Sequence, residues 1–241
     1  MMAIIKTLSD SQTLARAAAL HFTECAQERI AAQGYFAVAL AGGSTPRATY
    51  EILATVEFAS KIQWEKVFVF WGDERCVAPT HEDSNYRMAF EVLLRHSPIP
   101  VKQIFRMEGE LEPKEAAQAY EDRLRGFFGA KAPRFDLILL GLGDDGHTAS
   151  LFPGSKALEE RKHWVVANYV RRLSTWRLTL TTPLINQAAN VTFLVSGEGK
   201  AQVLRRVLAG RYTPEEIPAQ MIRPDHGQLR WLVDASAAAM L

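Results

Sequence analysis

Short apolar runs alternate along the chain with longer segments in which apolar residues recur at helical spacing. The runs are short, apolar and often rich in aromatic residues, which is typical of strands buried inside a sheet. We expect strands at residues 35–40, 66–72, 135–143, 163–168, 176–181, 191–197 and 228–234.

The segments between these runs predict helices. We expect them at residues 9–34, 45–55, 83–94, 112–128, 198–210 and, as a short C-terminal helix, 235–240. Gly34 is a typical helix stop, and Pro46 suits the first helical position after a cap at Ser44 or Thr45. The helix at 83–94 has an apolar face formed by Met88, Phe90, Val92, Leu93 and Leu94.

Strands separated by helices imply βαβ units, in which a mainly parallel sheet is covered by helices on both faces. The chain has 241 residues, and no linker or repeat divides it. We therefore predict a single α/β domain over residues 1–241 with a mainly parallel, Rossmann-like sheet. In such sheets ligands bind at the carboxyl ends of the strands, so the residues that follow each strand are the first candidates for a site.

The charge balance argues against partners that are held by a field over the whole surface. There are 28 basic and 27 acidic residues, and 48% of all residues are hydrophobic. This is the balance of an ordinary globular protein, and it gives no basis for binding nucleic acid or an anionic membrane. A small anionic substrate would need a local cluster of cations.

The cysteines and the N-terminal segment favour a reduced, cytoplasmic protein. Cys25 and Cys76 are the only cysteines, and they form neither a disulfide framework nor a zinc pattern. No apolar run approaches the length of about 20 residues that crosses a bilayer. The N-terminal segment reaches Lys6 and Asp10 too early for a signal peptide.

A glycine pair follows the first expected strand. Gly42 and Gly43 let main-chain N–H groups approach a ligand, and Ser44 and Thr45 stand at the start of the next helix. Together these residues predict a helix N-terminus suited to phosphate. A plain turn between strand and helix is an equal alternative, because the segment is neither a Walker A loop nor a G-x-G-x-x-G fingerprint.

Charged residues follow two further strands. Asp73, Glu74 and Arg75 come directly after residues 66–72. Arg75 could hold a phosphate in a bidentate fork, or it could form an ion pair with Asp73. Lys200 stands at the start of a helix, where a cation opposes the helix dipole, so it indicates either an anionic ligand or a solvated surface lysine.

The segment GLGDDGHTASLFPG, residues 141–154, contains more ionisable groups than a turn requires. His147 suits general acid–base catalysis near neutral pH, and Asp145 could orient its ring. An ordinary loop histidine is the alternative. A metal site is less favoured, because no second histidine stands at ligand spacing.

Six segments form a recognisable set in their order along the chain. They are LAGGSTPRATYEIL, WGDERCV, SNYRMAFEVLL, FDLILLGLGDDGHTASLFPG, RLTLTTPLIN and VSGEGKAQVL. Together they resemble the motifs of the 6-phosphogluconolactonase family of the oxidative pentose phosphate pathway. The resemblance implies the fold shared with glucosamine-6-phosphate deaminase, and hydrolysis of 6-phospho-D-glucono-1,5-lactone to 6-phospho-D-gluconate.

The deaminase pattern shares several of these motifs but differs at one position. It has a catalytic glutamate five residues after the histidine of its DGH loop, and here that position is Phe152. A phenyl ring cannot act as an acid or a base, so the resemblance favours the lactonase. An amino-sugar-phosphate deaminase and a non-catalytic sugar-phosphate sensor are the alternatives.

The resemblance also implies roles for single residues. His147 would be the general base, Asp145 would orient it, and Asp73 would bind a sugar hydroxyl. The substrate and its phosphate would be held by Gly42, Gly43, Ser44, Thr45, Arg75, Lys200 and Arg177. The expected partner is the sugar phosphate alone, with no metal or redox cofactor, and the sequence leaves the oligomeric state open.

Overall fold

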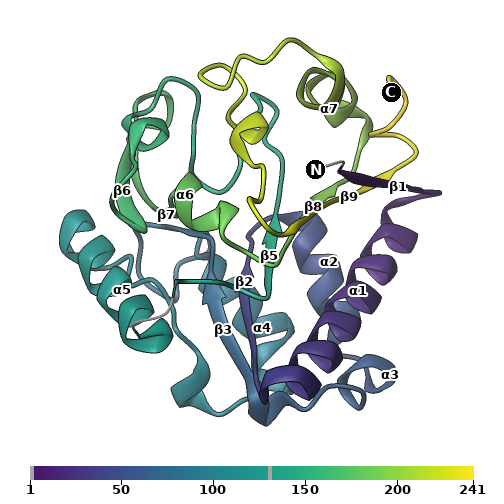
Figure 1. Cartoon of the computed structure of the whole chain (residues 1–241), viewed down its shortest axis with the longest axis vertical. Coiled ribbons are helices and arrows are strands. Elements are labelled where there is room, and N and C mark those ends of the chain that lie inside the picture. The colour runs from purple at the N-terminus through teal and green to yellow at the C-terminus, as the bar shows by residue number, and fades with distance from the viewer. Residues whose placement is uncertain (1–2, 130–131) are drawn as a thin grey trace.

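The structure is a computed structural model that describes residues 3–129 and 132–241. Its centre is a six-stranded sheet with the strand order β1-β9-β8-β5-β2-β3 (Figure 1). All neighbouring strands of this sheet are parallel. The strands are β1 (Ile4–Leu8), β2 (Phe36–Leu40), β3 (Val67–Trp71), β5 (Leu137–Leu140), β8 (Asn190–Val195) and β9 (Gln228–Asp234). The predicted α/β fold with a mainly parallel sheet is confirmed.

Helices cover both faces of the sheet, as Figure 1 shows for α1 and α5. The helices are α1 (Ser11–Gln33), α2 (Ser44–Leu53), α3 (Val56–Ala59), α4 (Asn85–Val92), α5 (Pro113–Phe128), α6 (Thr182–Asn186) and α7 (Ala201–Ala209). Alternate residues of a strand point to opposite faces. Accordingly, Phe36 and Val38 of β2 pack in one apolar cluster with residues of α1 and α2, and Ala37 and Ala39 pack in another with residues of α5.

Three further strands form a separate antiparallel sheet in the order β4-β7-β6. They are β4 (Asp73–Arg75), β7 (Thr175–Leu180) and β6 (Val165–Val170). The runs at 163–168 and 176–181 were expected in a mainly parallel sheet, and their placement there is wrong. The short turn between β6 and β7 cannot make the crossover that parallel neighbours need, so the two strands form a hairpin.

Local capping decides several helix ends. The Oδ1 atom of Asp10 accepts a hydrogen bond from the N–H of Thr13 at 2.7 Å, and Gly34 ends α1 with a φ of 87°. The expected cap at Ser44 or Thr45 is wrong, because α2 begins at Ser44 and Gly43 precedes it without a side-chain cap. Single 3-10 turns are found at Trp64–Lys66, Leu94–His96, Val101–Gln103, Lys156–Glu159, Arg171–Leu173, Glu198–Lys200 and Pro218–Met221.

Other expectations fail where the pattern of the chain is weak. Strand β1 was not predicted, because it lies at the edge of the sheet and its side chains are largely exposed. Residues 235–240 form turns rather than a helix. Phe90 was placed on the buried face of α4, but it is 40% exposed, whereas Leu93 and Leu94 are buried.

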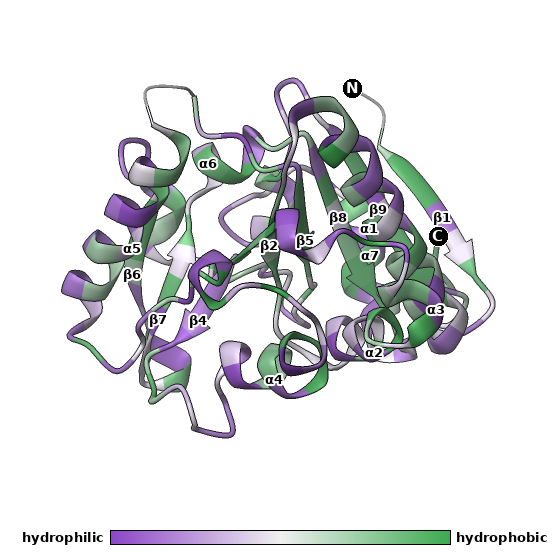
Figure 2. Ribbon diagram, turned by 90° about the horizontal axis from the view of Figure 1, so that it is seen from below, coloured by the Kyte–Doolittle hydropathy of each residue, from purple (hydrophilic) through white to green (hydrophobic). Residues whose placement is uncertain are grey.

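The distribution of hydropathy follows the layers. In Figure 2 the central strands β5 and β8 are largely hydrophobic, whereas α5 carries both hydrophobic and hydrophilic residues. Among the residues that the structure describes, no helix combines the length and the apolar character needed to span a bilayer.

Candidate active site

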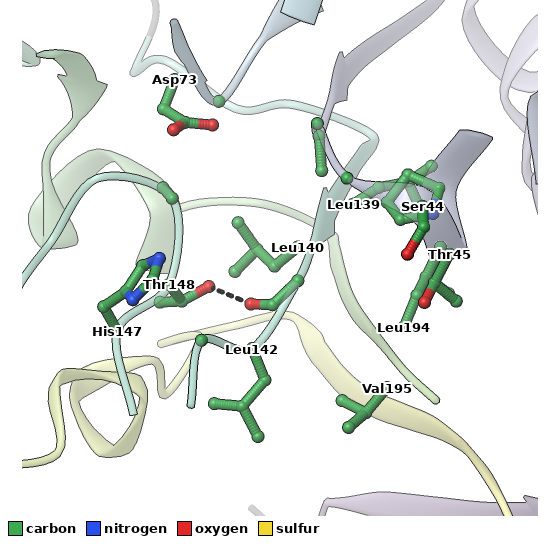
Figure 3. Close-up of a pocket in the computed structure, with 18 of the residues that line it drawn as sticks. Ser44, Thr45, Asp73, Leu139, Leu140, Leu142, His147, Thr148, Leu194 and Val195 are labelled. Carbon is green, nitrogen blue, oxygen red and sulfur yellow. Dashed lines mark hydrogen bonds between the residues drawn. The ribbon is translucent and has the colours of Figure 1, made fainter. Parts of the chain in front are cut away.

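A cavity of about 300 Å³ opens where strands β2, β5 and β8 end. Its walls include eight of the residues that the sequence singled out, namely Gly42, Gly43, Ser44, Thr45, Asp73, Arg75, His147 and Lys200. Figure 3 shows Ser44 and Thr45 on one side of it and His147 on the other. Two predicted residues, Asp145 and Arg177, do not line this cavity but lie next to residues that do.

The glycine pair is required by close packing and by its backbone angles. A Cβ atom on Gly42 would lie 1.8 Å from Oδ1 of Asn85, and Gly43 has a φ of 102°. Within the described residues, the N–H groups of Ser44 and Thr45 have no hydrogen-bond acceptor in the protein. The start of α2 therefore presents two free donors, as a site for an anion requires.

The charged triplet at 73–75 is a strand, so its side chains alternate. Asp73 and Arg75 line the cavity, whereas Glu74 is 2% exposed and points the other way. The Glu74 carboxylate accepts hydrogen bonds from the N–H groups of Asn85 at 2.8 Å and Tyr86 at 2.7 Å, at the start of α4. Burial raises the pKa of Glu74, and these N–H groups oppose that rise.

Asp73 and Arg75 do not form the ion pair considered from the sequence. The Asp73 Oδ2 atom accepts a hydrogen bond from the Ser150 hydroxyl at 2.7 Å, and Asn85 Nδ2 donates to the Asp73 carbonyl at 2.9 Å. The Arg75 guanidinium donates to the carbonyl of Asp83. Asp73 is thus held in place with its charge not neutralised by Arg75.

Arg177 lies directly opposite Arg75 in the pairing of β4 with β7. Burial lowers the pKa of Arg177, and the positive charge of Arg75 lowers it further. In residues 3–129 and 132–241, no carboxylate lies within ion-pair distance of either guanidinium. Like charges directly opposite each other destabilise a sheet, so this pair favours an anionic ligand.

His147 contacts Asp145, the residue that the sequence singled out as its partner. The Asp145 Oδ1 atom lies 2.5 Å from Nδ1 of the ring and accepts the N–H of His147 at 3.1 Å. A Cβ atom on Gly143 would lie 2.0 Å from this Nδ1, so glycine is needed there. Arg172, which the sequence analysis missed, places Nη1 2.9 Å from the Asp145 Oδ2 atom.

The charge of Asp145 is stabilised by these partners. Burial acts to raise the pKa of Asp145, but the hydrogen bonds to His147 and the charges of His147 and Arg172 lower it to about 2. The carboxylate is therefore ionised at neutral pH and can only accept hydrogen bonds. The hydrogen bond to Asp145 engages Nδ1 of His147, which leaves Nε2 as the ring nitrogen that can exchange a proton with a ligand.

Lys200 stands at the start of α7 and lines the same cavity as the glycine pair of the β2–α2 turn. Its ammonium group forms an ion pair with Asp144. Lys200 therefore has a carboxylate partner in the protein, and an anionic ligand would share its ammonium group with Asp144. Among the described residues, no group of three or more histidine, cysteine, aspartate or glutamate side chains could hold a metal ion.

Comparisons with known proteins identify the family of the chain. Residues 9–231 match the family described as glucosamine-6-phosphate isomerases/6-phosphogluconolactonase. The chain belongs to this family. A relative from Synechocystis, named 6-phosphogluconolactonase, is 42% identical over 241 residues, which covers 98% of each chain. A second relative of that name, from Nostoc, is 41% identical over 87% of this chain and 86% of its own.

Solved structures have the same fold. The 6-phosphogluconolactonase of Trypanosoma brucei superposes with a TM-score of 0.88 at 32% identity, over 100% of this chain and 99% of that one. A monomeric glucosamine-6-phosphate deaminase superposes with a TM-score of 0.82 at 21% identity, over 99% of this chain and 100% of that one, which shows a common fold only. The family that the sequence motifs predicted is confirmed.

Proposed function

We propose that the protein hydrolyses 6-phospho-D-glucono-1,5-lactone to 6-phospho-D-gluconate, with His147 as the general base. The observation that carries the proposal is the placement of a histidine with an engaged Nδ1 in the same cavity as free N–H donors, Arg75 and Lys200. Acid–base chemistry and anion binding therefore meet in one small space. The names of the relatives support the same substrate.

The reaction follows from which nitrogen of the His147 ring is engaged by Asp145. Asp145 accepts a hydrogen bond from Nδ1 of His147, so Nε2 is the ring nitrogen that can take a proton from a water molecule. The resulting hydroxide attacks the lactone carbonyl carbon and forms a tetrahedral oxyanion. When this intermediate collapses, the bond from that carbon to the ring oxygen breaks. The imidazolium returns its proton to the leaving oxygen, which becomes the free hydroxyl group.

The phosphate is assigned to the hydrogen-bond donors and cations that line the cavity. The N–H groups of Ser44 and Thr45 and the guanidinium of Arg75 face the cavity, and Arg177 adds positive charge beside Arg75. Lys200 completes the cation set. Asp73, which Ser150 holds in place, would accept a hydrogen bond from a sugar hydroxyl.

The deaminase alternative lacks the glutamate that its pattern places five residues after the histidine. The Phe152 ring stacks on the His147 ring with 4.0 Å between centroids, so the position five residues after His147 holds an apolar ring.

We assign the whole reaction to a single domain. A charged sugar phosphate stays in the compartment in which it forms. The proposal therefore includes the cytoplasmic location that is expected from the sequence.

The experiment follows the disappearance of the δ-lactone, made from glucose 6-phosphate by oxidation, against its spontaneous hydrolysis. We expect lactone loss to accelerate in proportion to the amount of protein, and His147→Gln to remove most of the acceleration. Release of ammonia from glucosamine 6-phosphate would instead support a deaminase. Thermal stabilisation by 6-phosphogluconate without any lactone turnover would support a sensor and contradict the proposal.

A further inference from the structure

The imidazole of His147 contacts two side chains, and a third side chain, that of Arg172, contacts both of them. The ring stacks on Phe152 with 4.0 Å between centroids and 21° between planes. Its Nδ1 atom lies 2.5 Å from Asp145 Oδ1. Arg172 Nη1 lies 2.9 Å from Asp145 Oδ2, and the Arg172 guanidinium lies 5.5 Å from the centre of the Phe152 ring. Arg172 thus links the two residues that hold the histidine.

We propose that Phe152 and Arg172 are positioning residues for His147, an inference that rests on the proposed function. One hydrogen bond fixes the distance between Nδ1 and Asp145 but leaves the ring free to turn about that bond. Stacking of the Phe152 ring on the imidazole prevents that rotation. The contact of Arg172 with Asp145 keeps the carboxylate from rotating together with the imidazole. Fixed geometry of a reacting group is worth a large factor in rate.

Phe152 is well placed for this role because it is itself fixed. Its side chain is 6% exposed, and the chain between it and His147 is held tightly. Ala149 has a φ of 46°, which residues with a side chain rarely adopt. Thr148 pairs with Leu151 across this turn. The turn returns the chain so that Phe152 lies against the face of the histidine ring.

The small antiparallel sheet supplies the other supports. Arg172 lies in the turn between β6 and β7. From the same sheet, the Thr179 hydroxyl accepts the N–H of Ser150 at 3.2 Å, and Asn168 Nδ2 donates to the Ser150 carbonyl at 2.8 Å. The β6–β7 hairpin therefore holds the histidine loop by its backbone and, through Arg172, by the carboxylate of Asp145.

Phe152 occupies the position that a glutamate has in the deaminase pattern. An acid there would exchange protons with the ring or compete with Asp145 for it, whereas a phenyl ring offers only a surface. The side chain at position 152 therefore packs against the imidazole and takes no part in proton transfer. What hydrolysis requires from residue 152 is a flat apolar face, and this predicts which substitutions preserve activity.

The test uses two pairs of variants and a matched control. Phe152→Leu keeps an apolar side chain without a flat face, and Phe152→Tyr keeps the ring. Phe152 borders a neighbouring cavity of about 890 Å³. Arg172→Met removes the contact with Asp145, and Arg172→Lys keeps a cation. Arg171→Met, in the same exposed turn, is the control.

We expect kcat to fall about 10-fold in Phe152→Leu and about 3-fold to 10-fold in Arg172→Met, with KM changed less than about 2-fold. Phe152→Tyr and Arg172→Lys should recover most of the loss, and Arg171→Met should match the wild type. Unchanged kcat in both Phe152→Leu and Arg172→Met would overturn the inference. A rise in KM at constant kcat would also overturn it, because it would place these residues in substrate binding.

A second readout needs no turnover. Nitrogen-15 NMR of the His147 ring reports which ring nitrogen carries the proton and how firmly that proton is held. We expect one tautomer with a slowly exchanging Nδ1 proton in the wild type, and faster exchange of that proton in Phe152→Leu and Arg172→Met. Identical ring spectra in these proteins would contradict the inference. If the wild type hydrolysed no lactone, the proposed function would fail, and the spectra would still decide the positioning roles.

Discussion

The two sides of the cavity treat their charges in opposite ways. Around His147, Asp145 binds both the ring and Arg172, so each charged group there has a partner inside the protein. On the other side, Arg75 and Arg177 lie opposite each other, and among the described residues neither has a carboxylate within ion-pair distance. The charged groups on the histidine side are therefore paired, whereas Arg75 and Arg177 have no carboxylate partner among the described residues.

This difference separates positioning from binding. A general base must have its geometry fixed before the substrate arrives, since catalysis depends on a preorganised arrangement. A phosphate brings its own charge, so the residues that receive it are left with unsatisfied charge until it binds. Arg75 and Arg177 repel each other, and a bound anion would offset that repulsion. Substitutions that remove a charge or a contact on each side of the cavity in turn test this difference.

The largest effect is expected on the histidine side. His147→Gln keeps a polar side chain of similar length but removes the base, so kcat should fall by about 10²-fold to 10⁴-fold with the fold intact. Steady-state lactone hydrolysis measures the loss, and circular dichroism checks the fold. A variant that keeps near-normal turnover would remove His147 from the mechanism.

The next effect is expected on the arginine side. A charge-assisted hydrogen bond is worth about 1.5–3 kcal/mol, so Arg75→Met should weaken binding of 6-phosphogluconate about 10-fold to 100-fold. Arg177→Met should weaken it less, because Arg177 does not line the cavity. Calorimetric titration measures both affinities. Arg205→Met, at an exposed position of α7, is the control, and equal losses in all three variants would contradict the assignment.

A change of stability is expected at the residue between Asp73 and Arg75. Glu74→Ala leaves the buried N–H groups at the start of α4 without an acceptor, which should lower the free energy of unfolding by about 1–3 kcal/mol. Urea denaturation measures this. Glu91→Ala, which removes only a surface ion pair with Arg87 on the same helix, should cost about 0.5 kcal/mol or less. Similar losses in both variants would show that Glu74 is not a structural cap.

The smallest effect is a change in how stability depends on pH. The pKa of Asp145 is lowered from 3.8 to about 2 in the folded protein. The ionised carboxylate therefore stabilises the fold above about pH 4, and this contribution is lost as the pH falls towards 2. In Asp145→Asn the free energy of unfolding should fall less steeply between about pH 4 and pH 2. Urea denaturation at several pH values measures the slope, with Asp122→Asn as the surface control, and an unchanged slope would contradict the ion pair.

The rule that ligands bind at strand ends predicted the cavity well. Gly42, Arg75, His147 and Lys200 follow different strands, and they meet because the carboxyl ends of parallel strands lie at one edge of a sheet. The orientation of His147 by Asp145 could be predicted because the two residues are close in sequence. The roles of these residues in catalysis and phosphate binding stay predictions.

Other parts of the site depend on how distant segments pack. Arg172 meets Asp145 only because the β6–β7 hairpin folds over the histidine loop, and no local pattern encodes that contact. Phe152 could be recognised as a missing acid, but its stacking on His147 depends on the turn at Ala149. The buried role of Glu74 became visible only once residues 73–75 were known to be a strand, since alternation then separates it from its neighbours.

The most direct test compares two substrates across both sides of the cavity. The ratio kcat/KM is measured with the phosphorylated lactone and with unphosphorylated glucono-1,5-lactone, for the wild type, His147→Gln and the double variant Arg75→Met with Arg177→Met. We predict that His147→Gln lowers both ratios by the same factor and that the double variant lowers only the ratio for the phosphorylated lactone. A double variant that lowers both ratios equally, or a His147→Gln protein that still hydrolyses either lactone at the wild-type rate, would contradict the account.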